Sequence, residues 1–168
     1  MPICDTLLRY AEEPSFFRMV WSPQILDEVA RGLAGPNFSY TPEQVERRIR
    51  SMRLAFPEAE ISFPEPLLEA VVGLPDANDR HVVAAAIKAG ANAIITDNLK
   101  DFPDIALEPY GLAAQSADDF LSHQFHLNPQ IAREKIQQQA AALAKPQELM
   151  ARLMQLTPNF AKLLAISK

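Results

Sequence analysis

The sequence predicts an α/β protein with a parallel sheet and a helical extension at its C-terminus. Up to about Gln124, short apolar strands alternate with amphipathic helices, which is typical of a parallel sheet with crossover helices. After Gln124 the strands stop and only helical patterns follow. Four prolines follow residues that favour helix N-caps, and they mark helix starts because the first helical residue needs no N–H partner. These pairs are Ser22-Pro23, Thr41-Pro42, Asn128-Pro129 and Thr157-Pro158.

Apolar spacing and the caps predict each element in turn. In chain order we expect a helix over 5–13, a strand over 17–21, helices over 23–33 and 42–56, a strand over 59–63, one or two helical turns over 66–72, a helix over 79–89, strands over 93–96 and 111–114, a helix over 117–125, and two or three helices over 129–143 and 146–165. The pattern is strongest over 42–56, where Thr41 and Gln44 have capping-box spacing. Gly90 supplies the stop for the helix over 79–89.

Composition favours one globular domain, or one domain with an appendage. The chain has 168 residues, of which 48% are hydrophobic and 22% charged. Its net charge of -5 requires that any nucleic acid be held by a local basic patch or a metal. Cys4 is the sole cysteine, which excludes an intramolecular disulfide. No apolar run approaches a membrane span and the N-terminus lacks a signal-peptide pattern, so we expect a cytoplasmic protein without a membrane partner.

Acidic residues cluster in the expected topology. Asp79 begins a helix, Asp76 lies in the loop before it, and Asp97 follows the strand over 93–96. Carboxyl ends of parallel strands and the starts of the following helices share one edge of a sheet. Carboxylates gathered there would suit Mg²⁺ or Mn²⁺, which can activate water for phosphodiester hydrolysis. Helix capping and turn formation explain the same residues equally simply, so spacing alone leaves both interpretations open.

The run LPDANDRHVVAAAIKAGANAIITDNLKDFP, residues 74–103, resembles the central signature of PIN-domain proteins, nuclease-like domains that include the VapC toxins. The segment WSPQILDE, residues 21–28, is similar to the family's second acidic element. The resemblance implies a three-layer α/β/α sandwich with a parallel sheet over residues 1–122. Residues 123–168 resemble the helical extension of one longer branch of the family.

The resemblance also implies a site of three or four acids that binds Mg²⁺ or Mn²⁺ and cleaves single-stranded RNA. Glu28 and Asp79 match the second and third acids, and Asp76 matches a further acid of this branch. The fourth position falls on Asn98, with Asp97 beside it as an alternative. The expected catalytic residues are therefore Glu28, Asp79 and Asp97, and the expected metal ligands are Glu28, Asp76, Asp79, Asp97 and Asn98. Thr96 would orient the site or contact phosphate. Asp101 is near these residues in the sequence, but a role as a turn residue explains it equally well.

Basic residues on the helix over 42–56 supply candidate phosphate contacts. Arg47 and Arg48 are the expected substrate-binding residues, with Arg50 and Arg53 on the same helix. Glu43 and Glu46 stand at ion-pair spacing from two of these arginines, so a solvated helix face is the alternative interpretation.

The leading hypothesis is a PIN-type endoribonuclease that is the toxin of a toxin–antitoxin pair, with RNA, an antitoxin and a second copy of the chain as expected partners. The alternative is a PIN-fold interaction module without catalysis. Family members begin with an apolar strand that ends in the first metal-binding aspartate, and no such strand precedes Asp5 here. Either the start at Met1 is internal to a longer gene, or the protein is a degenerate member. Loss of that central strand predicts lower stability or pairing with another chain.

Overall fold

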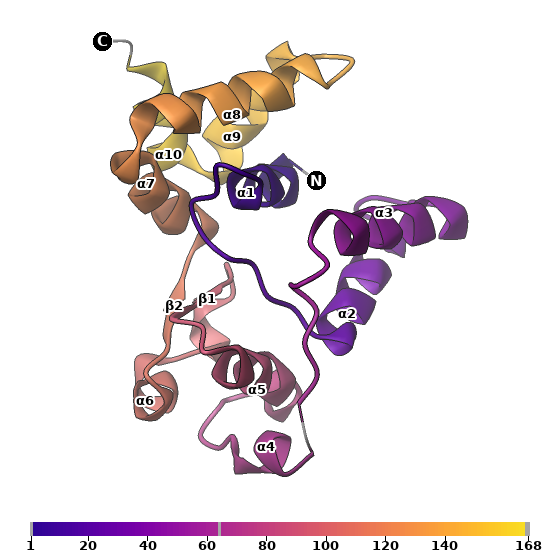
Figure 1. The fold of residues 1–168 in the computed structure, drawn as a ribbon, viewed down its shortest axis with the longest axis vertical. Coiled ribbons are helices and arrows are strands. Elements are labelled where there is room, and N and C mark those ends of the chain that lie inside the picture. Colours follow the sequence, from indigo (N-terminus) through magenta and orange to yellow (C-terminus); the bar gives the residue numbers. More distant parts are fainter. Residues whose placement is uncertain (1, 64, 167–168) are drawn as a thin grey trace. The chain divides into compact units, whose positions relative to one another are not determined.

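The computed structural model describes residues 2–63 and 65–166, which form helices with a small sheet (Figure 1). The elements in chain order are α1 (Pro2–Ala11), α2 (Pro23–Ala34), α3 (Pro42–Ala55), α4 (Glu65–Ala70), η1 (Ala77–Asp79), α5 (Arg80–Ala89), β1 (Ala93–Ile95), η2 (Leu99–Asp101), α6 (Asp104–Leu107), η3 (Glu108–Tyr110), β2 (Ala113–Gln115), α7 (Ala117–Leu127), α8 (Pro129–Ala141), α9 (Gln147–Leu156) and α10 (Pro158–Ala165). An η label denotes a single turn of 3-10 helix. None of the described helices combines the length and apolar character that a membrane crossing needs.

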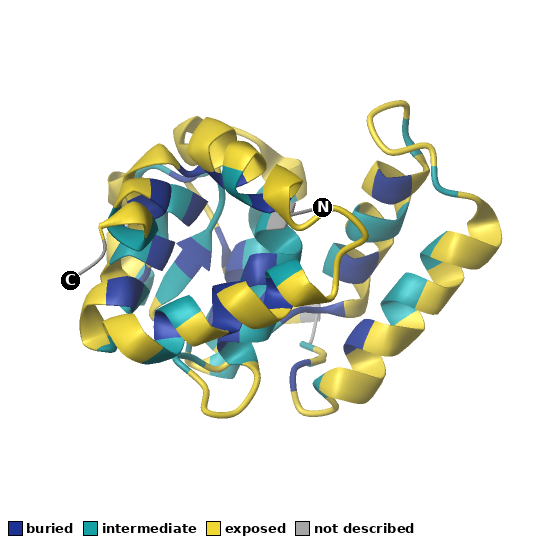
Figure 2. Ribbon diagram, turned by 90° about the horizontal axis from the view of Figure 1, so that it is seen from above, coloured by how far each residue is buried: buried dark blue, intermediate teal, exposed yellow. Residues whose placement is uncertain are grey.

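The chain divides into two compact units. The first, here called the helical unit, comprises Met1–Arg18, Ile95–Asp97 and Gln115–Lys168. The second, here called the acidic unit, comprises Met19–Ile94 and Asn98–Ala114. Each unit has its own apolar core, and buried positions occupy one face of the helices while the opposite face is exposed (Figure 2).

The core of the helical unit joins α1 to the C-terminal helices. Its buried residues are Tyr10, Leu121, Phe125, Ala132, Ile136, Leu149, Leu153, Phe160 and Ala161. Lys135 is also buried, and its Nζ donates hydrogen bonds of 2.8 Å to the carbonyls of Arg9 and Glu12. These carbonyls lie at the end of α1, where a helix lacks internal donors and favours a cation. Lys135 therefore fastens α1 to α8.

A side chain from another helix caps α10. The two carboxylate oxygens of Asp118 on α7 accept hydrogen bonds from the backbone N–H groups of Asn159 and Phe160, at 3.1 and 2.8 Å. The residue expected to cap this helix, Thr157, instead donates its hydroxyl to the Leu153 carbonyl at 3.1 Å. A helix start predicted from a local pattern is thus completed by a long-range contact.

The acidic unit packs α5 into its core. The buried cluster consists of Val71, Val83, Ala84, Ala86, Ile94, Phe102, Leu107 and Leu112. Several of the residues that α5 buries are small, Ala84 and Ala86 among them. Gly90 ends α5 with a φ of 63°, a left-handed conformation that favours glycine, as the sequence predicted.

The sheet is smaller than the sequence predicts. β1 pairs with β2 in parallel through bonds from Ala113 N–H to the Asn92 carbonyl, 3.2 Å, and from Thr96 N–H to the Gln115 carbonyl, 2.9 Å. The strands expected over 17–21 and 59–63 were wrong as regular strands, because among the described residues they form only an isolated parallel bridge between Trp21 and Glu60. The bridge cannot extend past Trp21, since Ser22 caps α2 and Pro23 has no N–H to donate.

The helix predictions are confirmed more fully. Ser22 caps α2, and Thr41 and Gln44 form the complete capping box of α3. The helix expected over 5–13 lies at Pro2–Ala11 instead. Short elements between residues 77 and 110, namely η1, η2, α6 and η3, were not predicted, because one-turn helices carry almost no periodic signal.

Candidate active site

Glu28 reaches the site from α2. Gln24, Glu28 and Arg31 lie on successive turns of one face of this helix, while Leu26 and Leu33 are buried on the other. The side chain of Glu28 is 44% exposed, so it can bind a solvent-borne ligand without unfolding its helix.

The loop before α5 separates the roles of Asp76 and Asp79. Asp76 caps η1, because its Oδ1 accepts a hydrogen bond of 2.8 Å from the Asn78 N–H. Asp79 occupies the N-cap position of α5 but makes no capping hydrogen bond with its side chain. Helix capping therefore explains Asp76 and leaves the Asp79 carboxylate unexplained.

Asp79 stands in a negative environment. Burial raises the pKa of its carboxyl group, and the nearby carboxylates of Asp76, Asp101 and Glu28 raise it further, against an opposing effect of His81. A carboxylate whose neighbours repel its charge gains from a bound cation. The carboxylates of Glu28, Asp76 and Asp101 are thus near enough to Asp79 to act on its charge.

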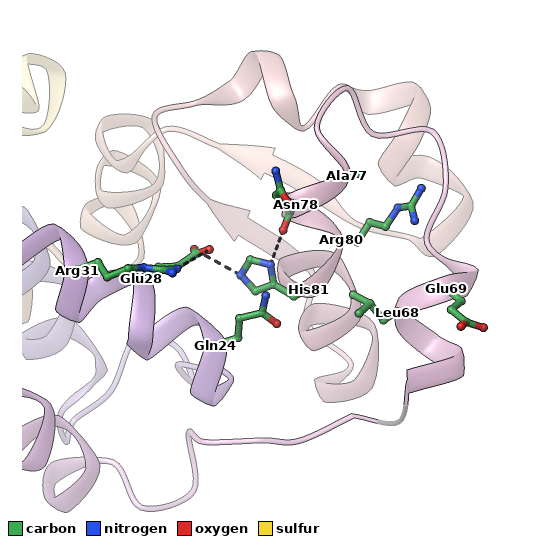
Figure 3. Close-up of a pocket in the computed structure, with 9 residues that line it drawn as sticks. All are labelled: Gln24, Glu28, Arg31, Leu68, Glu69, Ala77, Asn78, Arg80 and His81. Atoms are coloured by element: carbon green, nitrogen blue, oxygen red, sulfur yellow. Dashed lines mark hydrogen bonds and ion pairs between the residues drawn. The ribbon is translucent and has the colours of Figure 1, made fainter.

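The buried side chain of His81 lies next to Glu28. The imidazole is 1% exposed, and its Nδ1 lies 2.6 Å from the Asn78 carbonyl, which can only accept, so Nδ1 carries the hydrogen (Figure 3). Its Nε2 lies 3.4 Å from Oε2 of Glu28 and has no hydrogen-bond partner among the described residues. Oε1 of Glu28 lies 3.6 Å from Nη2 of Arg31. Both carboxylate oxygens of Glu28 therefore face nitrogen atoms.

A pocket of about 550 Å³ opens beside this pair within the acidic unit. Figure 3 shows its lining residues, which come from α2, α4, η1 and the first turn of α5. They are Gln24, Glu28, Arg31, Leu68, Glu69, Ala77, Asn78, Arg80 and His81. The volume is in the usual range of ligand sites, roughly 300–1,000 Å³.

The other predicted site residues have different local roles. Asp97 belongs to the helical unit, where its Oδ1 accepts a hydrogen bond of 3.3 Å from Ala117 N–H at the start of α7. Thr96 also belongs to that unit. Asn98 belongs to the acidic unit and donates its amide to the Asp101 carboxylate. The structure therefore groups Asn98 with Asp101, whereas the role of Asp97 in the site stays a prediction.

The predicted phosphate contacts lie on α3. Arg47 is exposed and Arg48 is half-buried, and Glu46 and Arg50 form the ion pair that their spacing predicts. Arg53 pairs with Glu60 at 2.7 Å. Part of this basic face is thus neutralised, as the solvated-face interpretation expects, while substrate binding by Arg47 and Arg48 stays a prediction.

The donors of the acidic unit match a hard divalent cation in kind and in charge. Carboxylate oxygens are the ligands that Mg²⁺ and Mn²⁺ prefer, and a cation beside Asp79 would offset both the burial and the neighbouring carboxylates that raise its pKa. Across residues 2–63 and 65–166, however, no three or more His, Cys, Asp or Glu side chains stand close enough together to hold one ion. Coordination would need side chains to turn inward, as exposed Glu28 can.

Sequence reasoning missed His81 and undervalued Asp101. Asp101 lies three residues after Asn98, a spacing that places both in one turn of η2, but turn residues commonly show the same pattern. His81 follows Asp79 by two residues and precedes an apolar run, which indicates a buried histidine without indicating its partner. Only the packing of α5 near α2 shows that this partner is Glu28.

Comparison with protein families defines the class. A family model described as PIN domain matches residues 5–100, more than half of the chain, and the chain belongs to this family. A second model, described as VapC50 C-terminal domain, matches residues 117–165. These matches confirm the resemblance seen in the sequence and the expected PIN-like α/β fold with C-terminal helices.

A particular relative is the protein named "Putative ribonuclease VapC50" from Mycobacterium tuberculosis (strain ATCC 25618 / H37Rv). The chain is 40% identical to it over 87 residues, which is 49% of this chain and 52% of the relative. The alignment thus spans about half the length of either protein. No solved structure matches the chain.

Proposed function

We propose that this protein is a divalent-metal-dependent endoribonuclease of the PIN type and the toxin component of a toxin–antitoxin pair. The observation that carries the proposal is Asp79, a partly buried carboxylate that caps nothing and is surrounded by the charges of Asp76, Asp101 and Glu28. Family membership and the printed name of the relative support the same reaction class.

In this proposal Glu28, Asp76 and Asp79 hold Mg²⁺ or Mn²⁺, with Asn98 or Asp97 at the fourth position and Asp101 beside Asn98. A bound divalent ion supplies an activated water and stabilises charge on the phosphate. The protein's own residues place and orient the substrate: Thr96 contacts phosphate through its hydroxyl, and Arg47 and Arg48 hold the RNA backbone. We keep residues 1–122 as the PIN-like part and 123–168 as a helical extension, an assignment supported by the separate match over 117–165.

A PIN-fold interaction module without catalysis is the second candidate. It is favoured by one observation, that no described group of three ligating side chains is close enough together to hold an ion. This candidate expects an antitoxin-like partner or a second copy of the chain to bind, with no RNA cleavage.

Cleavage of labelled single-stranded RNA in the presence of Mn²⁺ separates the two candidates. We expect the wild-type protein to cut the RNA and Asp79→Asn to lose at least about a hundredfold in rate, as for the loss of an essential charge-stabilising group. Asp27→Asn is the matched control, because Asp27 is an exposed neighbour of Glu28 on α2. Equal cleavage by Asp79→Asn and the wild type would remove Asp79 from the mechanism. A wild type that neither binds Mn²⁺ nor cuts the RNA would favour the interaction module.

A further inference from the structure

The pocket beside Glu28 is lined by two arginines, Arg31 and Arg80, and by two carboxylates, Glu28 and Glu69. Figure 3 shows Arg31 at the α2 end and Arg80 toward the α4 end, with Glu28 and His81 between them. Arg31 is 73% exposed and its contact with Glu28 is long, at 3.6 Å, so little holds it in place. Arg80 has no ion-pair partner in the described part of the chain. Two guanidinium groups that line the pocket can therefore contact an anionic ligand.

The wall of the pocket contains a buried ring nitrogen, Nε2 of His81, that lies 3.4 Å from Oε2 of Glu28 but makes no hydrogen bond with any described residue. His81 is 1% exposed, and its ring is fixed by the Asn78 carbonyl. Buried polar atoms are nearly always paired, and with the hydrogen on Nδ1 the Nε2 atom of His81 has a lone pair that can accept a hydrogen bond from a ligand. A second observation besides the charges thus points to binding in this pocket.

The remaining lining residues suit the base of a nucleotide better than a bare anion. Gln24 and Asn78 carry amide groups that can both donate and accept hydrogen bonds, and Leu68 offers an apolar surface. Unstacked bases of single-stranded RNA are recognised through contacts of these kinds. Glu69 on α4 also lines the pocket, and its carboxylate can accept hydrogen bonds from the amino groups of a base.

We propose that this pocket is the groove in which single-stranded RNA lies across the site, with Arg31 and Arg80 each holding a phosphate that flanks the one at Glu28. The inference rests on the proposed nuclease function for the identity of the ligand, and it assigns a binding path on α2 and α5 that differs from the arginines of α3. Neutralisation of the acidic cluster by a divalent cation makes this path attractive to a polyanion.

The test measures RNA binding separately from cleavage. Anisotropy of a short fluorescein-labelled random oligoribonucleotide is titrated with protein in Ca²⁺ over a range of salt concentrations, and cleavage in Mn²⁺ is followed in parallel. Arg31→Ala and Arg80→Ala should each weaken binding about fivefold or more, and each should make the salt slope shallower by about 0.7, the value for one single-strand phosphate contact. Arg80→Lys should recover most of the affinity, since an ionic contact tolerates lysine and a purely structural role would not.

The double variant and a control sharpen the result. If the two arginines contact separate phosphates, the double variant Arg31→Ala with Arg80→Ala should lose RNA affinity by the product of the two single fold-losses. Arg152→Ala, on the exposed face of α9 in the helical unit, should bind like the wild type. Wild-type affinity and salt slope in both single variants, or no RNA binding by the wild type, would overturn the groove. If the arginine variants lose RNA binding and the wild type does not cleave RNA, the groove is kept and the nuclease function is rejected. If the wild type cleaves RNA and the arginine variants bind it as the wild type does, the nuclease function is kept and the groove is rejected.

Discussion

Replacement of His81 tests whether the Glu28–His81 pair matters for metal binding. In His81→Leu the carboxylate of Glu28 loses the nitrogen that lies 3.4 Å from its Oε2. The leucine that replaces the imidazole on α5 has a similar size, so the packing changes little. Groups that orient a metal ligand typically contribute 10- to 100-fold in metal affinity, so we expect Mn²⁺ to bind about 10- to 100-fold more weakly, a change of about 1.4–2.7 kcal/mol.

Folding stability should change much less. The variant loses the hydrogen bond from Nδ1 to the Asn78 carbonyl, worth about 1 kcal/mol, and it removes the unpaired buried Nε2, whose desolvation costs a similar amount. These two effects oppose one another, so the free energy of unfolding of the metal-free protein should stay within about 1 kcal/mol of the wild type. Metal affinity and stability are therefore expected to separate.

Calorimetric titration with Mn²⁺ and thermal melting of the metal-free protein measure the two quantities. His81→Gln should recover part of the affinity, because its amide can place a nitrogen near the position of Nε2. His123→Leu is the control, since His123 is exposed on α7 in the helical unit. The reasoning fails if folded His81→Leu binds Mn²⁺ as tightly as the wild type.

Three further predictions concern charge and stability. Because burial and neighbouring acids raise the pKa of Asp79, folding favours its protonated form, so its contribution to stability is present at low pH and is lost as pH rises through the raised pKa. Asp79→Asn should therefore stabilise the metal-free protein near neutral pH, by less than about 1 kcal/mol because the group is largely solvated, and urea unfolding without this gain would contradict the electrostatic account. Lys135→Met should lower the free energy of unfolding by about 2 kcal/mol and Tm by about 4–8 °C, because it loses two charge-assisted hydrogen bonds to α1. The control Lys145→Met, at an exposed ion pair, should stay within about 0.5 kcal/mol of the wild type. Equal melting temperatures for the two variants would show that Lys135 does not stabilise the contact of α1 with α8. Asp118→Ala should cost about 1 kcal/mol by uncapping α10, measured by the same melts, and an unchanged Tm would refute that role.

Local chemistry in the sequence was sufficient for the helices. Ser22 and Thr41 cap α2 and α3 through bonds to residues three positions away, so every participant lies within one turn of the chain. The same holds for Gly90, whose conformational freedom ends α5. The family could also be inferred from sequence, because its acids and its strand–turn pattern lie together over residues 74–103.

Contacts between residues that are distant in the sequence could not be predicted from local patterns. The strands expected over 17–21 and 59–63 have suitable residues, yet strand formation depends on partners distant in the chain, and only the Trp21–Glu60 bridge forms. Thr157 is of a residue type that commonly caps helices, but the side chain that caps α10 is Asp118 from α7.

The candidate site shows the same division. The sequence by itself determined which acids are available, Glu28, Asp76 and Asp79 among them, because residue type sets ligand chemistry. Tertiary structure decided that Asp101 joins them, that Asp76 caps a turn while Asp79 does not, and that buried His81 faces Glu28. Charge repulsion and burial depend on distances across the fold, which no local pattern of residues specifies.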